Sequence, residues 1–413
     1  MRSVKLHLAG SLAATLLLSV SPSATQAQAQ AAQAGMDPAH PFVGVTTPEQ
    51  WLARFRTGKP NVVPRDPWGN LTTSALVDKA TGGFWVGQPG MTPAKIANVA
   101  TPDARGARAS EEIGGTGVQI RSPYPYKSAQ EHYDAWRAAA GGGTKKTRDQ
   151  LPDWSGEWTG GAQGVIHGEA RISDVMAATA PSYRDHYRQY LHAEWEGHTW
   201  WGYAFCLPHG YPQTLNGNGA TYHLMSDQNL VKIHNGSRGS NEFLNIYTDG
   251  RGFAPAGKLP PQWYGESAGF WDGDELVAYT KNVKSWLMAP GLPETSGKLE
   301  TVLRIKRLGD KMLMDVTIYD PEAFAFPWHD VVIYNKVRDP VSNPQTYLSC
   351  LYTNNVYQAE DGSVNERLPG DPGFRDPADP RPWATAFETW AQNHKELNAQ
   401  WEAAFKKDEE AAR

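Results

Sequence analysis

The sequence predicts a mainly β protein with flanking helices, folded as a closed, calycin-like antiparallel β-barrel with an irregular N-terminal arm and a C-terminal helix. Between residues 199 and 336 the chain holds a series of short runs with strand composition, separated by Gly, Asn, Asp or Pro and without intervening helices. Two connections, at 226–228 and 308–310, are short enough for hairpins, which pair strands antiparallel. Closure into a barrel would remove the exposed edges of so long a meander.

Strands are predicted wherever β-branched and aromatic residues gather between turn residues. The predicted strands are 154–160, 199–205, 221–225, 229–234, 242–248, 275–281, 299–307, 311–319 and 328–336.

Helices are predicted mainly outside the barrel. A short helix at 48–55 places Trp51, Leu52 and Phe55 on one face. Ser128 and Glu131 form a capping-box pattern, which opens a helix that ends at the glycines 141–143.

Two further helices are predicted later in the chain. One has Pro181 in its first turn and Gly197 just past its end. The last helix, 384–411, carries an apolar stripe, which favours docking on the barrel over a partner-binding tail. The stripe consists of Phe387, Trp390, Leu397, Trp401 and Phe405.

The N-terminus has the pattern of a cleaved secretory signal. Arg2 and Lys5 precede an apolar run at 8–20, and Ala27-Gln28-Ala29 offers a cleavage site. The apolar run is too short for a membrane span, so we expect a periplasmic or secreted protein without membrane insertion. The predicted organisation is a signal peptide at 1–29, an extended arm with short helices at 30–150, the barrel at 151–358, and a linker with the C-terminal helix at 359–413.

Composition argues against nucleic acid or an anionic membrane as partner, because the formal charge is only −5 and no block of like charge stands out. Aromatic residues are abundant, with 16 Trp and 17 Tyr. They suit both a Trp-rich β core and a pocket for an aromatic or apolar small molecule.

The two cysteines, Cys206 and Cys350, favour a disulfide in an exported protein, with two separate buried thiols as the alternative. They are too few for a structural zinc site, and the histidines show no local metal-ligand spacing. No phosphate-cradling glycine loop or redox motif is present, so neither a metal nor an organic cofactor is predicted.

The pentapeptide Gly265-Glu266-Ser267-Ala268-Gly269 has the G-x-S-x-G pattern of a serine-hydrolase nucleophile elbow. An elbow needs a buried strand before the serine and a helix after it. Here a proline-containing segment, 258–264, precedes the motif and a strand-like run follows it. The context favours a glycine-bounded loop that enters a strand, with Ser267 capping a turn.

Histidines near strand ends are the natural candidates for proton transfer near neutral pH. Five lie in the barrel region, namely His198, His209, His223, His234 and His329. We select His223, His234, His329 and His198 as candidate catalytic residues, and expect His223 and His234 to face one another on neighbouring strands. The candidate substrate-binding residues are Trp200, Trp201, Tyr211, Tyr222, Arg251, Tyr264, Trp271 and Trp328.

Asp249 and Arg251 favour a structural turn, in which the carboxylate accepts turn N–H groups and pairs with the guanidinium. An anion or substrate clamp is the alternative.

A set of motifs resembles a largely uncharacterised family of exported bacterial proteins. The motifs are Leu151-Pro152-Asp153-Trp154-Ser155-Gly156, Cys206-Leu207-Pro208, Ile246-Tyr247-Thr248-Asp249-Gly250-Arg251, Gly265-x-Ser267-x-Gly269-x-Trp271-x-Gly273-Asp274, Asp320-Pro321 through Pro327-Trp328, and Cys350-x-x-x-Asn354-Asn355. The resemblance covers roughly 151–355 and implies export and a lipocalin-like barrel. This chain departs from the family pattern at Glu266 and Phe270, where histidines are common.

Three functions are consistent with these observations. The first is an enzyme without organic cofactor that acts by acid–base proton transfer on an aromatic or apolar small molecule. A lyase fits best, for example one catalysing retro-aldol cleavage of a phenylpropanoid or lignin-derived compound. The second is a non-catalytic periplasmic carrier of a hydrophobic ligand. The third is a secreted serine esterase that uses Ser267.

Overall fold

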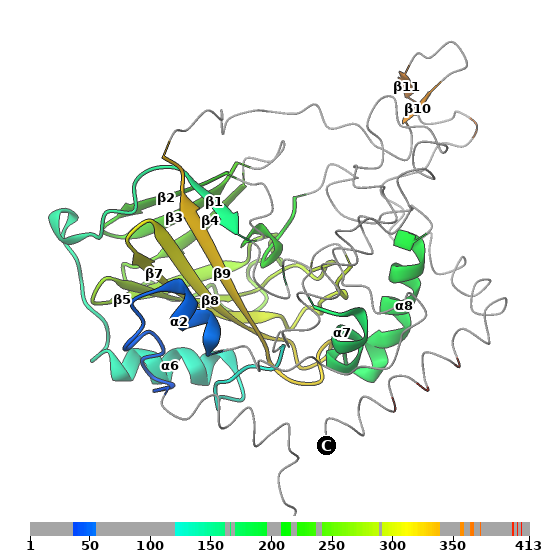
Figure 1. Ribbon diagram of the computed structural model, residues 1–413, viewed down its shortest axis with the longest axis horizontal. Coiled ribbons are helices and arrows are strands. Elements are labelled where there is room, and N and C mark those ends of the chain that lie inside the picture. Colours follow the sequence, from blue (N-terminus) through cyan, green and yellow to red (C-terminus); the bar gives the residue numbers. More distant parts are fainter. Residues whose placement is uncertain are drawn as a thin grey trace, which may run out of the picture.

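The computed structural model describes residues 36–54, 120–161, 166, 170–195, 208–215, 221–236, 242–288 and 291–338, together with short pieces at 356–358 and 364–366 and single residues beyond them. Nine strands form a closed barrel in which sequence order is also spatial order, and β1 closes on β9 (Figure 1). The predicted β-barrel with flanking helices is thereby confirmed. The barrel strands are β1 Trp158–Gly161, β2 Thr221–Asp227, β3 Leu230–Asn235, β4 Glu242–Tyr247, β5 Glu266–Asp272, β6 Glu275–Lys281, β7 Glu300–Leu308, β8 Lys311–Tyr319 and β9 Trp328–Lys336. A separate hairpin pairs β10 (Val356–Gln358) with β11 (Val364–Glu366).

Most strands lie where the turn residues in the sequence predicted them. The bounds of β6, β8 and β9 match the prediction, and β2, β3, β4 and β7 differ from it only at their ends. β1 begins at Trp158 rather than at Trp154. The Trp154 ring instead lies 5.2 Å from that of Trp271, centroid to centroid. The predicted strand 199–205 lies outside the described residues.

The expectation of a loop at the G-x-S-x-G motif is wrong, because residues 266–272 form a full barrel strand, β5. β5 runs parallel to β4 and antiparallel to β6. Gly265 has φ +63°, and a Cβ there would lie 2.5 Å from the Lys281 carbonyl oxygen. A Cβ on Gly269 would lie 2.7 Å from the Val277 carbonyl oxygen. The two glycines therefore serve a turn and a close approach between strands.

A long connection, 248–265, is required because parallel strands start at the same end of the barrel. It begins with the turn predicted at Asp249, whose Oδ1 accepts from the Arg251 amide at 3.0 Å and whose Oδ2 lies 2.6 Å from the Arg251 guanidinium. The structural interpretation of this pair is confirmed. Further on, the Ala254 amide donates to Glu266 Oε1 at 2.9 Å, which ties the connection to the start of β5.

The two ends of the barrel differ. At one end, called here the hairpin end, the turns 228–229, 273–274 and 309–310 join successive strands, and residues 144–157 approach it, with the Thr144 amide donating to the Trp271 carbonyl at 2.7 Å. At the opposite end, called here the mouth, β2, β4, β5, β7 and β9 begin. Helices α7 (Ile172–Ala178) and α8 (Pro181–Trp195) lie beside the mouth, on the right in Figure 1. α8 was predicted and α7 was not.

The N-terminal segments cover the outer wall, with α6 below the barrel and α2 in front of its strands in Figure 1. α6 (Ala129–Ala139) packs Tyr133 and Trp136 against β6, β7 and β8. α2 (Pro48–Ala53) buries Trp51 against β8 and β9. Ser128 caps α6 as predicted, but the Glu131 carboxylate accepts from the Lys127 amide, so the capping box is only half formed.

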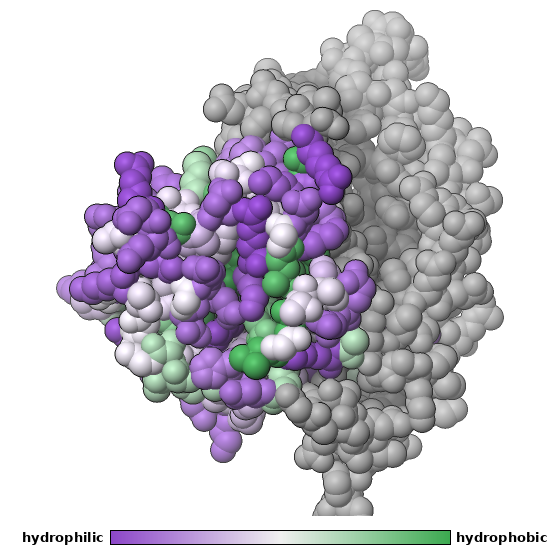
Figure 2. All heavy atoms as spheres, turned by 60° about the vertical axis from the view of Figure 1, so that its left-hand side comes forward, coloured by the Kyte–Doolittle hydropathy of each residue, from purple (hydrophilic) through white to green (hydrophobic). Residues whose placement is uncertain are grey.

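The hairpin end faces the reader in Figure 2, which turns the left side of Figure 1 forward. This face is largely hydrophilic, with a small group of hydrophobic residues near its centre. The predicted signal peptide, both cysteines and most of the C-terminal helix lie outside the described residues. None of the helices that the structure describes has the length and apolarity needed to cross a bilayer.

Candidate functional site

The segment 208–215 enters the barrel at its mouth and is buried there. Its last turn is the 3-10 helix η4 (Gln213–Leu215). The Tyr222 hydroxyl and the Asn235 amide each donate to the Thr214 carbonyl at 3.0 Å, and the Tyr334 hydroxyl donates to the Leu215 carbonyl at 2.7 Å. Inward side chains of β2, β3 and β9 thus hold this segment in place.

A group of buried hydroxyls lies beneath the same segment. Thr301 Oγ1 donates to the Tyr211 hydroxyl at 2.9 Å, and Ser267 Oγ lies 2.7 Å from Thr280 Oγ1. Burial raises the pKa of Tyr211 to about 12, with the Thr301 hydrogen bond acting in the opposite direction. Among the described residues the partner of the Ser267 hydroxyl is a threonine rather than a basic group, which supports a structural role for this serine.

An acid–base pair joins the segment to the start of β4. Glu242 Oε1 accepts from the His209 backbone amide at 2.7 Å and lies 3.1 Å from His209 Nδ1. Both side chains are buried. Burial alone would raise the pKa of Glu242, but the hydrogen bonds and charge of His209 outweigh it, so this pKa is lowered. Glu242 therefore stays ionised and holds the imidazole through Nδ1.

Tyr264 completes this group. The Tyr211 amide donates to the Trp263 carbonyl at 2.8 Å, which fixes the chain beside the His209 segment. Burial, followed by the negative charge of Glu242, raises the pKa of Tyr264 far above its ordinary value. Within the described chain, the Tyr264 hydroxyl and Glu242 Oε2 are both buried and make no hydrogen bond of normal geometry. The two groups still interact, because Tyr264 helps to lower the pKa of Glu242 and the Glu242 charge adds to burial in raising that of Tyr264.

Two of the predicted catalytic histidines lie outside the barrel. His223 and His234 are cross-strand partners on β2 and β3, with ring centroids 5.7 Å apart, so they face one another as predicted. They do so on the outer wall, where His234 also stacks on Phe243 at 4.6 Å. The inward positions of these strands are taken by Tyr222, Leu224, Val231 and Ile233.

His329 lies in a third place, beneath α6. Its Nε2 is 2.9 Å from Asp315 Oδ2, which also accepts from the Tyr124 hydroxyl at 2.7 Å. All three residues are buried. His198 lies outside the described residues. The structure therefore does not bring His223, His234 and His329 into one site.

The predicted substrate-binding residues are also dispersed. Tyr211 and Tyr222 are buried in the barrel, and Tyr222 stacks on Tyr334 at 4.3 Å. Trp271 is at the hairpin end, and Arg251 is an exposed turn residue. Trp328 stacks on Phe324 at 4.0 Å and donates from its indole to the Ala178 carbonyl at 3.1 Å. Tyr264 lies beside the Glu242 carboxylate, and burial together with that charge raises its pKa. Trp200 and Trp201 lie outside the described residues.

Sequence reasoning missed Glu242, Asn235, Thr280, Thr301 and Tyr334. Glu242 had a usable signal, because it alternates with Leu244 and Ile246 and so shares their inward face. A carboxylate on an apolar face is unusual unless it is paired. His209 was noted as one of five histidines but was not selected.

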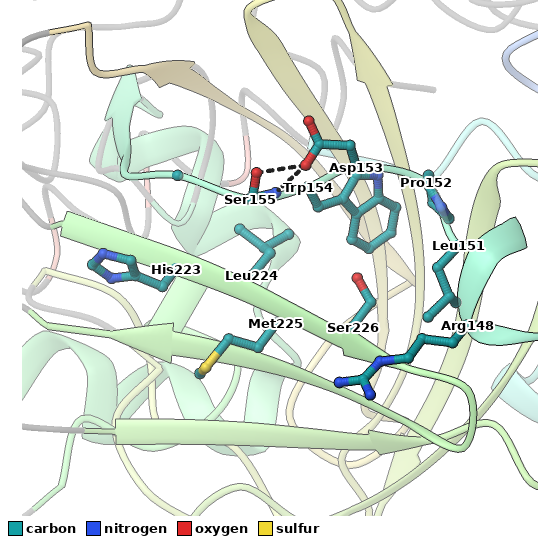
Figure 3. Close-up of a pocket in the computed structure, with 11 residues that line it drawn as sticks. Arg148, Leu151, Pro152, Asp153, Trp154, Ser155, His223, Leu224, Met225 and Ser226 are labelled. Atoms are coloured by element: carbon teal, nitrogen blue, oxygen red, sulfur yellow. Dashed lines mark hydrogen bonds between the residues drawn. The ribbon is translucent and has the colours of Figure 1, made fainter.

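A second hollow lies away from the mouth. It is a surface cavity of about 510 Å³ between residues 148–156 and the outer part of β2 (Figure 3). Its lining includes His223, one of the predicted catalytic residues, together with Arg148, Trp154 and Met225.

Within the described ranges, no three His, Cys, Asp or Glu side chains converge as a metal site would require. In comparisons with known proteins, no family model matches the chain and no curated protein matches it. The resemblance to a family of exported proteins therefore stays a prediction.

Proposed function

We propose that this protein is an exported enzyme that acts on an aromatic or apolar small molecule by acid–base proton transfer at the barrel mouth, without an organic cofactor. The observation that carries the proposal is the buried His209–Glu242 pair, whose carboxylate interacts with Tyr264. The predicted signal peptide supports a reaction in the periplasm or outside the cell.

Each of the three side chains has a distinct part in the proposal. Glu242 holds the imidazole through Nδ1, so Nε2 is the nitrogen that exchanges the proton. Tyr264 stays protonated at neutral pH because its pKa is raised, and so it donates a hydrogen bond to developing negative charge on a substrate oxygen. Trp263 and Tyr211 add aromatic surface next to this group.

A lyase fits these groups best. In a retro-aldol cleavage, His209 removes the proton of a substrate hydroxyl, and the O–H electron pair forms a carbonyl as the adjacent C–C bond breaks. The electron pair of that bond stays on the other carbon, which takes up a proton. The step needs only a base, a proton donor and exclusion of water. The atoms and electrons of this step balance without an oxidant or a metal.

The test is turnover of a panel of phenylpropanoid and lignin-type compounds by the purified protein, with products identified by mass spectrometry. His209→Gln and Glu242→Gln should each lower kcat by roughly 10²- to 10⁴-fold, the usual contribution of a general base. His186→Gln is the matched control, because His186 lies on α8 with about half of its side chain exposed.

Two outcomes would contradict the proposal. If His209→Gln turns over substrate at the full rate and unfolds at the same midpoint as the unaltered protein, His209 is not the general base. Tight binding of a panel compound without any product would instead favour the non-catalytic carrier.

A further inference from the structure

The surface cavity at the hairpin end is an open hollow with a mixed polar and apolar lining. Its volume of about 510 Å³ lies within the usual range of small-molecule pockets. One part of the lining is apolar and comes from Leu151, Pro152, Trp154, Leu224 and Met225. Figure 3 shows Trp154 above β2 and the Arg148 side chain running beneath Ser226 toward Met225.

The cavity carries one unbalanced charge. The Arg148 guanidinium makes no hydrogen bond or ion pair with any residue that the structure describes. The neighbouring cations are engaged, since Lys146 Nζ lies 2.9 Å from Asp274 and Arg307 pairs with Asp153. Arg148 is thus available for an anionic group.

Asp153, the acidic residue of the lining, does not neutralise the charge of Arg148. The Asp153 carboxylate accepts from the Ser155 hydroxyl and amide, at 2.5 and 3.0 Å, and these bonds lower the pKa of Asp153 to about 2. Figure 3 shows this carboxylate at the far rim from Arg148, pointing away from it. A second polar atom, His223 Nδ1, is buried in this wall and makes no hydrogen bond within the described chain.

We propose that this cavity binds an amphipathic organic anion. A carboxylate or sulfonate head pairs with Arg148, and an aromatic or aliphatic body lies on Leu151, Pro152 and Met225. Planar guanidinium groups favour such oxyanions, and the apolar wall supplies the rest of the binding surface. The site is on the outer wall and is independent of the chemistry proposed at the mouth.

The test uses two fluorescent probes of similar shape, the anionic 1-anilinonaphthalene-8-sulfonate and the neutral N-phenyl-1-naphthylamine. Arg148→Ala should weaken binding of the anionic probe by roughly two- to fivefold, the range of an exposed ion pair, and leave the neutral probe unchanged. Met225→Ala should weaken both probes, because Met225 is an exposed part of the apolar wall. Arg137→Ala on α6 removes an equal charge elsewhere and should change neither.

The results separate this site from the mouth. If Arg148→Ala and Met225→Ala both leave the anionic probe unaffected, the proposal is wrong. Equal weakening of both probes by Arg148→Ala would also overturn it, because the guanidinium would then not act through its charge. Glu242→Gln at the mouth should have no effect on either probe, and loss of anionic binding in that variant would assign the probe to the mouth.

Discussion

Acid should weaken the attachment of α6 to the barrel through His132. This side chain is fully buried between Tyr126, whose ring stacks on it at 4.5 Å, and Trp136 at 4.0 Å. Its Nδ1 lies 3.0 Å from the Tyr319 hydroxyl, while its Nε2 is buried without a partner in the described chain. Protonation would put a proton on both nitrogens and leave a buried Nε2–H without an acceptor. Burial, and then the nearby His329 and Arg304, lower the pKa of His132 well below 6.5.

The sign and size of the effect follow from linkage. The pKa is lower in the folded protein, so the contribution to stability is complete above pH 6.5 and is lost as the pH falls toward the folded value. The free energy of unfolding should fall by about 1.4 kcal/mol for each pH unit below the unfolded pKa. Between pH 7.5 and 5.5 the loss from this residue is therefore about 1.4 kcal/mol.

Urea unfolding at the two pH values, followed by tryptophan fluorescence, measures the loss. His132→Gln keeps a group that can hydrogen-bond to Tyr319 but cannot titrate. The difference in pH dependence between the two proteins isolates His132, since the other titrating groups are common to both. An identical loss in His132→Gln would refute the reasoning, because the acid sensitivity would then come from elsewhere.

Two further predictions concern stability. Gly269→Ala should lower the free energy of unfolding by roughly 1–3 kcal/mol, since its Cβ would meet the Val277 carbonyl at 2.7 Å and Ile246 Cγ2 at 2.9 Å. Thermal unfolding measures this loss. The control is Gly252→Ala, whose Cβ would have no atom within 4 Å and which should change the free energy of unfolding little. Asp320→Ala should cost about 3 kcal/mol, because the Ser296 amide and hydroxyl, each 2.6 Å from the carboxylate, would lose their buried acceptor. A loss below about 0.5 kcal/mol in urea unfolding would contradict this estimate, with exposed Asp134→Ala as the control.

The fold was largely predictable because its strands are bounded by clear turn signals. The short connections at 226–228 and 308–310 predicted two hairpins, and the structure has turns at 228–229 and 309–310 between strands. β5 was not predicted because Gly269 within it, and Gly265 and the prolines before it, are unfavourable in strands. A glycine is needed at position 269 because of tertiary contacts. Its backbone lies against β4, which is remote in the chain, and against β6, which pairs with β5 across a turn.

The candidate site was much less predictable. His209 and Glu242 are 33 residues apart, and only the insertion of 208–215 into the barrel brings them together. The histidines on β2 and β3 were correctly paired, but a shift of one residue decides which face of a sheet they occupy. Here Tyr222 and Ile233 take the inward positions, so His223 and His234 point outward.

The pairing of β1 with β9 makes closure of the barrel depend on its last strand. Until β9 is in place, β1 and β8 each present an unpaired edge that other chains can join. β9 also supplies Val331 and Ile333 to the cluster around Trp51, and its His329 amide donates to the Ile120 carbonyl at 2.7 Å. The segment around Trp51, which is synthesised early, therefore gains the β9 part of its binding surface only when the last barrel strand arrives, whereas α6 packs on β6, β7 and β8. A chain cut before Trp328 would lose the barrel closure together with the β9 side of the cluster around Trp51.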